Sequence, residues 1–362
     1  MDPNALVLAG AGHVHAVLIG LWLRHPRCRP DGPITLVSRR ADLLYSGLVP
    51  AVLAGLVAPR DARLDLRAGC RRAGIRWLQA DITGLHPAAA CLALADGTAL
   101  PYRYLSLDVG SVTAVVQPME QPLRPLEETL PWLLARAPRQ LRLRGGGASA
   151  VELALALRAR GFSPALVLRG QRLQLGSPAA ERAAERLLAA AGIAVERGAA
   201  AAAPAQLACT GNRAPAWLAA AGLPVEAATG RVLTDATLRV RGWPAVFAAG
   251  DCAVVQQAPR PPAGVWAVRA APVLATNLRR SLAGSRRPLR RWRPPRQALQ
   301  LLGDGGAVTG RPRALALWGA GCLGPWRLLW WFKLWLDRRF VRRLRRLQAR
   351  RTRPRSSRVS AL

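Results

Sequence analysis

Lysine is almost absent from this sequence. Lys333 is the single lysine among the 53 basic residues, and the rest are arginines. Acidic residues are also few, 20 in 362, so the formal net charge is +33. A charge of this size is typical of proteins that bind nucleic acids or other polyanions. An arginine excess in a chain rich in Ala, Leu, Gly and Pro is also what a genome-wide coding bias produces, and we expect that bias to account for most of the charge.

Cysteine and histidine are scarce as well. The six cysteines include no C-x-x-C pair, which excludes a small disulfide-built scaffold. The four histidines show no spacing typical of a metal site, and we expect no bound metal. The first residues contain no basic segment of a secretion signal, which favours a cytoplasmic location. Because 51% of the residues are apolar, the chain can bury a core, and a disordered polycation is excluded.

A glycine-rich turn joins the first two predicted elements. A strand-like apolar run precedes Gly10-x-Gly12, and an apolar helical pattern over 13–23 follows. With a second strand predicted at 34–37, this is the β-turn-α-β start of a parallel sheet. Gly10 allows the tight turn, Gly12 lets a pyrophosphate approach the backbone, and the helix begins with free N–H groups. His15 stands where a third glycine is usual, and an ordinary strand-to-helix turn is the alternative.

A second turn of the same kind, Gly145-x-Gly147-x-x-Ala150, follows a proline-rich link. The helical pattern after it is strong and includes Glu152. The strand before it alternates leucine with arginine, whereas a buried parallel strand is normally apolar throughout. The sequence therefore predicts two nucleotide-binding units in one chain.

Both units lack the carboxylate that usually binds the ribose hydroxyls after the second strand. Ser38-Arg39-Arg40 stands at that place in the first unit, and Arg169 does in the second. An arginine there could meet a phosphate, such as the 2′-phosphate of NADPH, or lie in solvent at a strand end.

A third motif ends a strand with small residues and one carboxylate, in the segment VFAAGD over 246–251. Asp251 could accept hydrogen bonds from a polyol chain or cap a helix. The order of these motifs resembles that of the FAD-dependent pyridine nucleotide-disulfide oxidoreductase superfamily. The resemblance is greatest to the NAD(P)/FAD oxidoreductase module associated with selenide, water dikinase, and the chain is also similar to type 2 NADH:quinone oxidoreductases. The segments that carry it are 6–16, 45–55, 105–111, 144–157, 247–253 and 264–278.

The resemblance implies an α/β fold with two Rossmann-like dinucleotide-binding domains, parallel sheets and β-meander insertions. A discontinuous FAD-binding domain would cover 1–117 and 207–283, and an NAD(P)H-binding domain would cover 126–206. The C-terminal region is then 284–362. Residues 198–206 (GAAAAAPAQ) replace the β-meander that normally ends the second domain, so we expect that domain to be shortened.

The resemblance also implies which residues bind each nucleotide. Those expected at FAD are Gly10, Gly12, His13, Ser38, Arg39, Ser46, Gly47, Pro50, Asp81, Ile82, Gly110, Gly250, Asp251, Val265, Trp266 and Ala267. Those expected at NAD(P)H are Gly145, Gly147, Ala150, Glu152 and Gly211. No catalytic side chain is expected, because the flavin carries the redox chemistry.

The cysteines offer one further possibility. The chain lacks the C-x-x-x-x-C pair of the disulfide reductases in this superfamily. Cys209 and Cys322 are candidates for the separated cysteines of sulfide:quinone enzymes, but we favour inert buried thiols at both positions.

The C-terminal segment predicts an amphipathic helix over 326–347. An apolar stripe occurs at helical spacing, with tryptophans at one end and arginines at the other. The stripe consists of Leu329, Phe332, Leu336, Phe340, Leu344 and Leu347. Such a helix suits either the interface of an anionic membrane, on the inner face, or packing on the core; Arg327 and Lys333 argue against a membrane-spanning segment.

Taken together, the sequence predicts an FAD-dependent oxidoreductase that passes electrons from NAD(P)H through flavin to a small-molecule acceptor, with a quinone favoured. One alternative is a degenerate FAD-binding protein without NAD(P)H activity, suggested by the shortened second domain. The other is a basic nucleic-acid-binding protein, suggested by the charge but not by any recognition module.

Overall fold

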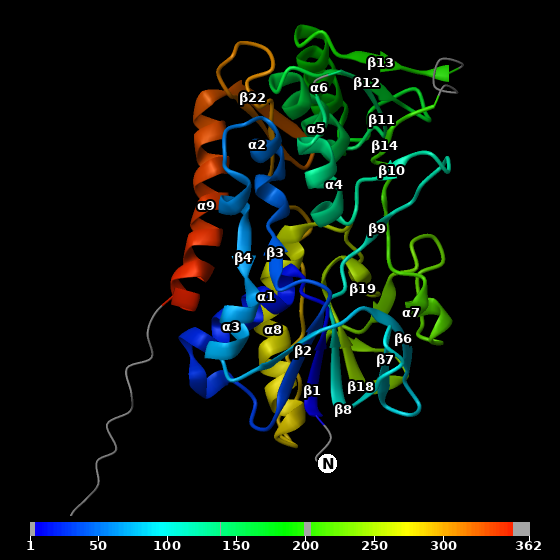
Figure 1. Ribbon diagram of the computed structural model, residues 1–362, viewed down its shortest axis with the longest axis vertical. Coiled ribbons are helices and arrows are strands. Elements are labelled where there is room, and N and C mark those ends of the chain that lie inside the picture. Colours follow the sequence, from blue (N-terminus) through cyan, green and yellow to red (C-terminus); the bar gives the residue numbers. More distant parts are fainter. Residues whose placement is uncertain (1–3, 138, 199–203, 350–362) are drawn as a thin grey trace, which may run out of the picture.

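The computed structural model describes residues 4–137, 139–198 and 204–349. Two parallel sheets lie one above the other, and the long C-terminal helix α9 runs along one side of both (Figure 1). The basic tail from 350 onward and most of the predicted meander replacement, 199–203, lie outside the described residues.

The first sheet contains five parallel strands in the order β5-β2-β1-β8-β18. These strands are β1 (Asn4–Ala9), β2 (Ile34–Ser38), β5 (Arg76–Gln79), β8 (Ala99–Leu107) and β18 (Trp243–Ala248). The predicted β-meander joins β5 to β8 through β6 (Ile82–His86) and β7 (Cys91–Leu94), with a turn at Asp96-Gly97. Beyond β18 the sheet continues with β17 (Arg239–Val240), β16 (Val232–Thr234) and β19 (Ala253–Val255).

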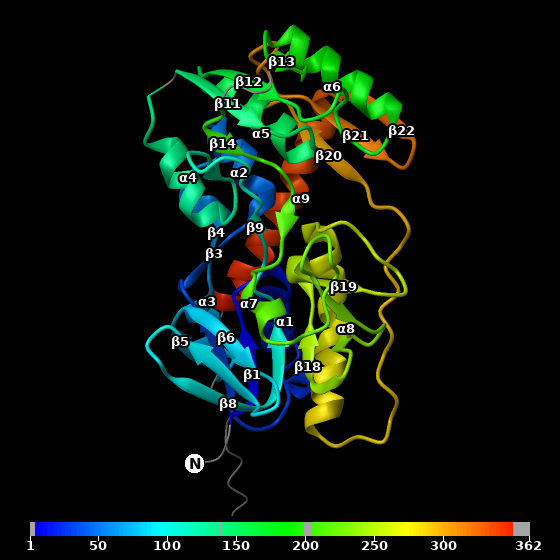
Figure 2. The ribbon, with the colours of Figure 1, turned by 90° about the vertical axis from the view of Figure 1, so that its right-hand side faces the viewer.

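Helices α1 (His13–Arg24) and α8 (Gly264–Leu282) pack against each other beside this sheet (Figure 2). Residues 6–9 of β1 are apolar and buried, and all five residues of β2 are buried, including the polar Thr35 and Ser38. Gly12 begins α1 without a side-chain cap, so the first N–H groups of the helix face the turn. The strand-turn-helix-strand order predicted for 5–37 is present.

The second sheet contains five parallel strands in the order β10-β14-β11-β12-β13. They are β10 (Gln121–Pro122), β14 (Leu207–Ala208), β11 (Gln140–Arg144), β12 (Ser163–Val167) and β13 (Ala194–Glu196). The accompanying helices are α4 (Leu126–Leu134), α5 (Ala148–Ala159) and α6 (Pro178–Ala190). The two β-turn-α units thus form two Rossmann-like sheets, which confirms the predicted α/β fold class.

The C-terminal part adds an antiparallel sheet and one long helix. The strands are β20 (Gln300–Gly303), β21 (Ala314–Trp318) and β22 (Gly321–Trp326), and the helix is α9 (Arg327–Ala349). Shorter elements are β3 (Asp42–Leu44), α2 (Val49–Leu53), β4 (Arg63–Asp65), α3 (Leu66–Arg72), β9 (Val112–Thr113), β15 (Asn212–Arg213) and α7 (Trp217–Ala220). Helix α9 contacts α1, α3 and β4 near the first sheet and β20–β22 near the second. It therefore ties the two halves of the molecule together.

Candidate dinucleotide-binding site

The turn after β1 requires glycine at both of its predicted positions. Gly10 has φ +93, and a Cβ there would lie 2.3 Å from the carbonyl oxygen of Asp108. A Cβ on Gly12 would lie 2.3 Å from the Asp108 carboxyl group. The turn therefore approaches the end of β8 so closely that any side chain would collide with it.

His15 replaces the third glycine with a polar bridge. Its ring is fully buried, with Nδ1 2.7 Å from the carbonyl oxygen of Gly10 and Nε2 2.9 Å from Oγ of Ser106. Burial lowers the pKa of His15 to about 4, so the ring is neutral at neutral pH. Because the carbonyl can only accept, Nδ1 donates to it and Nε2 accepts from the serine hydroxyl. The imidazole thus connects α1 to the end of β1 and to β8 by hydrogen bonds, at a position where a glycine would let the helix pack directly on the strands.

Asp108 is the residue at this site that the sequence analysis missed. It follows β8 directly, is 2% exposed, and its Oδ2 accepts a 2.9 Å hydrogen bond from the backbone N–H of His15. Burial raises the pKa of the Asp108 carboxyl to about 7. A charged residue directly after the strand-like run YLSL (104–107) was the available signal.

The loop after β18 brings the third motif to the same place. Gly250 has φ +79, and a Cβ there would lie 2.4 Å from Oδ1 of Asp108. Asp251 lies 3.6 Å from the Arg124 guanidinium, and the Ser111 hydroxyl donates to it at 3.5 Å. Asp251 caps no helix, because it lies inside the short 3-10 helix Gly250–Cys252, whose N-cap is Ala249. The alternative interpretation of this aspartate as a cap is therefore wrong.

The N-terminus of α8 adjoins this loop. One small pocket is lined by Gly250 and Asp251 from the loop and by Trp266 and Ala267 from the first turn of α8. Val265 is the second residue of the same helix. Gly110, with φ +71, follows Asp108 on the way out of β8. The predicted residues from four distant parts of the chain thus meet at the carboxyl ends of β1, β8 and β18.

His13 and Tyr45 extend the site toward the second sheet. Their ring centroids are 5.5 Å apart. Nε2 of His13 is buried without a hydrogen-bond partner among the described residues, and burial lowers the pKa of this ring to about 4. Ser46 and Gly47 follow Tyr45 in a 3-10 turn, and Pro50 lies in the first turn of α2. The segment predicted to lie near the flavin ring therefore neighbours the glycine-rich turn.

The end of β2 is occupied by ion pairs instead of an open ribose site. The Arg39 guanidinium lies 2.5 Å from Asp81 and 2.7 Å from Glu128, and its side chain is 62% exposed. The Ser38 hydroxyl donates to the carbonyl of Arg40 and accepts from the Trp77 indole. Ile82 begins β6 immediately after Asp81. Arg39 is thus held at the strand end by carboxylates, although such exposed pairs are weak and can exchange for a phosphate.

The second glycine-rich turn has its own close approach. Gly145 has φ +145, and a Cβ there would lie 2.5 Å from the carbonyl oxygen of Cys209 after β14. Gly147 is the N-cap of α5 with open space around it, and Ala150 is fully buried at the third position. Gly211, with φ +86, follows in the Thr210-Gly211 turn. Gly145, Gly147 and Ala150 therefore form the strand-to-helix turn that the motif predicts, and Gly211 lies in the separate turn after β14.

The arginines of β11 that conflict with a buried parallel strand have specific partners. Arg144 is buried and forms an ion pair with Glu120, whose side chain is fully buried. Arg142 pairs with Glu196 at the end of β13. Paired charges can be buried where single ones cannot, so β11 remains a central strand.

Glu152 takes part in a charged cluster that the sequence did not predict. Nζ of Lys333 on α9 lies 3.6 Å from Oε1 of Glu152, 3.2 Å from Oδ2 of Asp337 and 3.1 Å from the carbonyl oxygen of Gly47. The Tyr45 hydroxyl donates to Oδ1 of Asp337 at 3.0 Å, and Glu152 accepts the N–H of Gly303 at 2.9 Å. The single lysine thus joins α9 to helix α5 beside the second sheet and to the Ser46–Leu48 turn.

The predicted orientation of α9 is partly wrong. Two members of the predicted apolar stripe, Phe332 and Leu336, are 41% and 40% exposed. The buried face instead contains Trp330, Lys333, Leu334, Asp337, Val341 and Leu344. The prediction failed because it defined the buried face from apolar residues alone, whereas the pairing of Lys333 with Asp337 lets these two charged residues be buried.

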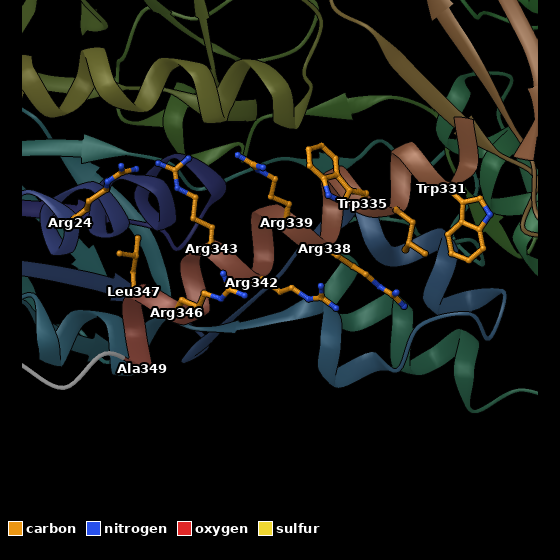
Figure 3. Close-up of a pocket in the computed structure, with 11 residues that line it drawn as sticks. Arg24, Trp331, Trp335, Arg338, Arg339, Arg342, Arg343, Arg346, Leu347 and Ala349 are labelled. Carbon is orange, nitrogen blue, oxygen red and sulfur yellow. The ribbon is translucent and has the colours of Figure 1, made fainter. Parts of the chain in front are cut away.

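The outer face of α9 is basic and aromatic. Trp331 and Trp335 are 56% and 52% exposed, and an open groove of ≈ 970 Å³ runs along the helix. Arg338, Arg339, Arg342, Arg343 and Arg346 project along it, and Arg24 reaches it from α1 (Figure 3). Within the described part of the chain, no helix is both long and apolar enough to span a membrane.

The cysteines form no disulfide among the described residues. Burial raises the pKa of Cys209 and of Cys252 to about 12, and burial also raises the pKa of Cys322. Cys209 and Cys322 are only partly buried, so the full burial expected for them is not observed. Thiols with raised pKa values are poor nucleophiles, which still favours an inert role at both positions.

Comparison with known proteins gives structural likeness without sequence likeness. No protein-family model matches the chain, and no curated protein matches it in sequence. The solved structure of the sulfide:quinone oxidoreductase from Aquifex aeolicus is similar over 94% of this chain and 91% of that one, with 17% identity and a TM-score of 0.71. The covalent putidaredoxin reductase–putidaredoxin complex matches over 88% of each chain, with 20% identity and a TM-score of 0.66. NADH:rubredoxin oxidoreductase from Clostridium acetobutylicum covers 83% of this chain and 82% of that one, with 13% identity and a TM-score of 0.65.

These likenesses cover 83% to 94% of this chain, so they concern most of the architecture. They show that this chain shares its fold with these three solved oxidoreductase structures.

Proposed function

We propose that the chain is an FAD-dependent oxidoreductase that takes electrons from NAD(P)H and passes them through the flavin to a quinone. The observation that carries this proposal is the meeting of Gly10, Gly12 and Gly250 at the start of α1. A Cβ on Gly10 would collide with the backbone of Asp108, and a Cβ on Gly12 or Gly250 would collide with the Asp108 carboxyl group. Such a cradle at the carboxyl ends of parallel strands suits a pyrophosphate.

The residues present fit FAD in the first sheet. Gly10, Gly12 and His13 would receive the pyrophosphate at the start of α1, and Gly250-Asp251 would face it from the loop after β18. The unpartnered Nε2 of His13 is a polar atom available to the cofactor. Ser46, Gly47 and Pro50 would lie at the flavin ring, with Val265, Trp266 and Ala267 at its other edge. Ser38, Arg39, Asp81, Ile82 and Gly110 would surround the adenosine part and close over it.

The residues of the second sheet fit NAD(P)H. Gly145, Gly147 and Ala150 would receive its pyrophosphate at the start of α5, with Gly211 in the facing turn. When bound, the flavin supplies hydride and electron transfer. The chain's own residues bind and orient the two nucleotides: Glu152, held by Lys333, fixes α5 against Gly47 and so sets the distance between the two binding turns.

The quinone acceptor is supported by likeness to the sulfide:quinone oxidoreductase, but other similar structures name rubredoxin or a putidaredoxin partner. The outer face of α9 favours an acceptor in a membrane. Exposed tryptophans beside arginines suit the interface of an anionic membrane, on the cytoplasmic side. Part of the predicted basic tail lies outside the described residues.

Vesicle sedimentation tests this membrane contact. We expect the full chain to bind vesicles containing phosphatidylglycerol far better than neutral ones, and we expect added salt to weaken the binding. Changing Arg342, Arg343 and Arg346 to glutamine should reduce the bound fraction severalfold. The matched control changes three exposed arginines of the segment between α8 and β20, Arg286, Arg287 and Arg291. Equal loss in both variants would refute a specific role for α9.

Anaerobic spectroscopy tests the electron path. The oxidised flavin band should bleach on addition of NADH or NADPH and return on addition of a short-chain ubiquinone or menaquinone. A band that is present but never bleaches would favour the degenerate FAD-binding alternative. Tight, steeply salt-dependent nucleic-acid binding without any flavin would favour the polyanion-binding alternative.

A further inference from the structure

A carboxyl group lies inside the cradle proposed for the FAD pyrophosphate. Asp108 approaches within 2.3 Å of the place where a side chain on Gly12 would begin and within 2.4 Å of the corresponding place on Gly250. It also accepts the backbone N–H of His15 in the first turn of α1, at 2.9 Å. The side chain that fills the space between the two glycines is therefore itself an anion when ionised.

Backbone N–H groups at the start of α1 stabilise a negative charge on Asp108, but no cationic side chain of the described residues pairs with it. From α1 it faces the His15 ring, which is neutral because burial lowers its pKa to about 4. From the short 3-10 helix Gly250–Cys252 it faces the Cys252 thiol and the Asp251 carboxylate, and the latter raises the pKa of Asp108 further by repulsion. Two cations lie near this helix: Arg124 pairs with Asp251 at 3.6 Å, and Arg231 donates to the carbonyls of Arg260 and Ala253. Among the described residues Asp108 forms no ion pair with either of them.

A pyrophosphate diester brings two more negative charges to the same helix start. The pyrophosphate needs hydrogen bonds from the same N–H groups that now donate to Asp108, and it would lie against the same glycines. An ionised Asp108 would repel it at short range in a buried site, whereas a neutral carboxyl could donate a hydrogen bond to a phosphate oxygen.

We propose that Asp108 couples FAD binding to the uptake of one proton: the neutral carboxyl admits the pyrophosphate, and the ionised carboxyl excludes it. The proposal rests on the proposed function, because it concerns the FAD site. No covalent step is involved, and the proton comes from solvent.

The direction of the pH dependence follows from linkage. Burial places the pKa of Asp108 at about 7 in the chain without ligand, and bound FAD would raise it. Above about pH 7, each pH unit should therefore weaken FAD binding about tenfold, until the pKa of the complex is passed. Below about pH 6 the affinity should be constant.

The test is a fluorescence titration of apo full-length protein with FAD from about pH 6 to about pH 9. Asp108→Asn keeps the shape of the side chain but cannot ionise. The dissociation constant of this variant for FAD should therefore change by less than about twofold over this pH range, and at the alkaline end it should lie below the wild-type value. Asp31→Asn, at an exposed loop position, removes the same charge elsewhere and should behave as wild type.

A second measurement does not depend on a variant. Calorimetry of FAD binding at about pH 8, in buffers of different ionisation enthalpy, should report the uptake of about one proton per FAD. FAD binding without proton uptake, or with an unchanged pH dependence in Asp108→Asn, would overturn the role of Asp108 and leave the proposed function standing. No FAD binding at any pH would overturn both.

Discussion

Replacement of Lys333 by methionine would remove the one cation of a buried cluster. Its side chain is 11% exposed, and its Nζ lies within 3.6 Å of two carboxylates, Glu152 and Asp337. Removing one partner of such a buried group typically costs about 3–5 kcal/mol, because the remaining charges lose their compensation. Burial already raises the pKa of Glu152, and loss of the lysine would raise it further. Protonation of this carboxyl therefore limits the loss, so we expect about 3 kcal/mol near pH 8 and less near pH 5.

Urea unfolding of the apo protein measures this loss. Arg342→Met, an exposed cation on the same helix, is the matched control and should cost less than about 0.5 kcal/mol. Glu152→Gln in the Lys333→Met background should recover at least about 1 kcal/mol, because it removes one uncompensated carboxylate. A loss below about 1 kcal/mol in Lys333→Met, or a loss equal to that in the Arg342 control, would refute the argument that the cluster ties α9 to both sheets.

Three further predictions follow from the same geometry. Gly10→Ala should lower the free energy of unfolding by about 3 kcal/mol or more, because Gly10 has φ +93 and a Cβ there would lie 2.3 Å from backbone. The control Gly147→Ala, with open space around the residue, should cost less than about 1 kcal/mol. Thermal unfolding measures both losses, and equal effects would contradict this prediction. The double variant Cys209→Ser, Cys322→Ser should keep NAD(P)H-dependent quinone reduction within about twofold, and a tenfold or greater loss would indicate thiol chemistry. The pKa of Asp108 is about 7 in the folded chain and 3.8 in the unfolded chain. The stability that Asp108 contributes is therefore fully present below pH 3.8 and is lost as the pH rises through about 7. The melting temperature of the apo wild type, compared with Asp108→Asn, should fall over this window, and parallel curves would show that Asp108 does not titrate there.

The sequence predicted the elements whose local patterns are strong. The apolar runs of β1 and β2, the glycine turns and the small-residue end of β18 each specify a backbone geometry within a few residues, so their order identifies the fold. The positions of Gly10, Gly12 and Gly250 could be predicted because glycine there answers a local requirement, a positive φ or a close approach.

The parts that could not be predicted depend on pairing over long separations. Lys333 and Asp337 appear polar on a helical wheel, and only contact with Glu152, Tyr45 and Gly47 allows them to be buried. For the same reason the buried face of α9 was assigned wrongly.

Two further features were hidden in the same way. The arginine in β11 conflicts with a buried strand until Glu120 is placed beside it. Asp108 was visible as a charge after an apolar strand, but its place between Gly12 and Gly250 emerges only when β8, α1 and the loop after β18 are brought together.

The central claim is that the first sheet holds FAD, and the flavin content of the purified chain tests it most directly. The protein is incubated with FAD, freed of excess ligand near pH 6, denatured, and its released flavin is separated by chromatography and quantified. The account predicts about one FAD, and no FMN, for each chain. A chain that releases no flavin after this loading, or releases FMN alone, would contradict it.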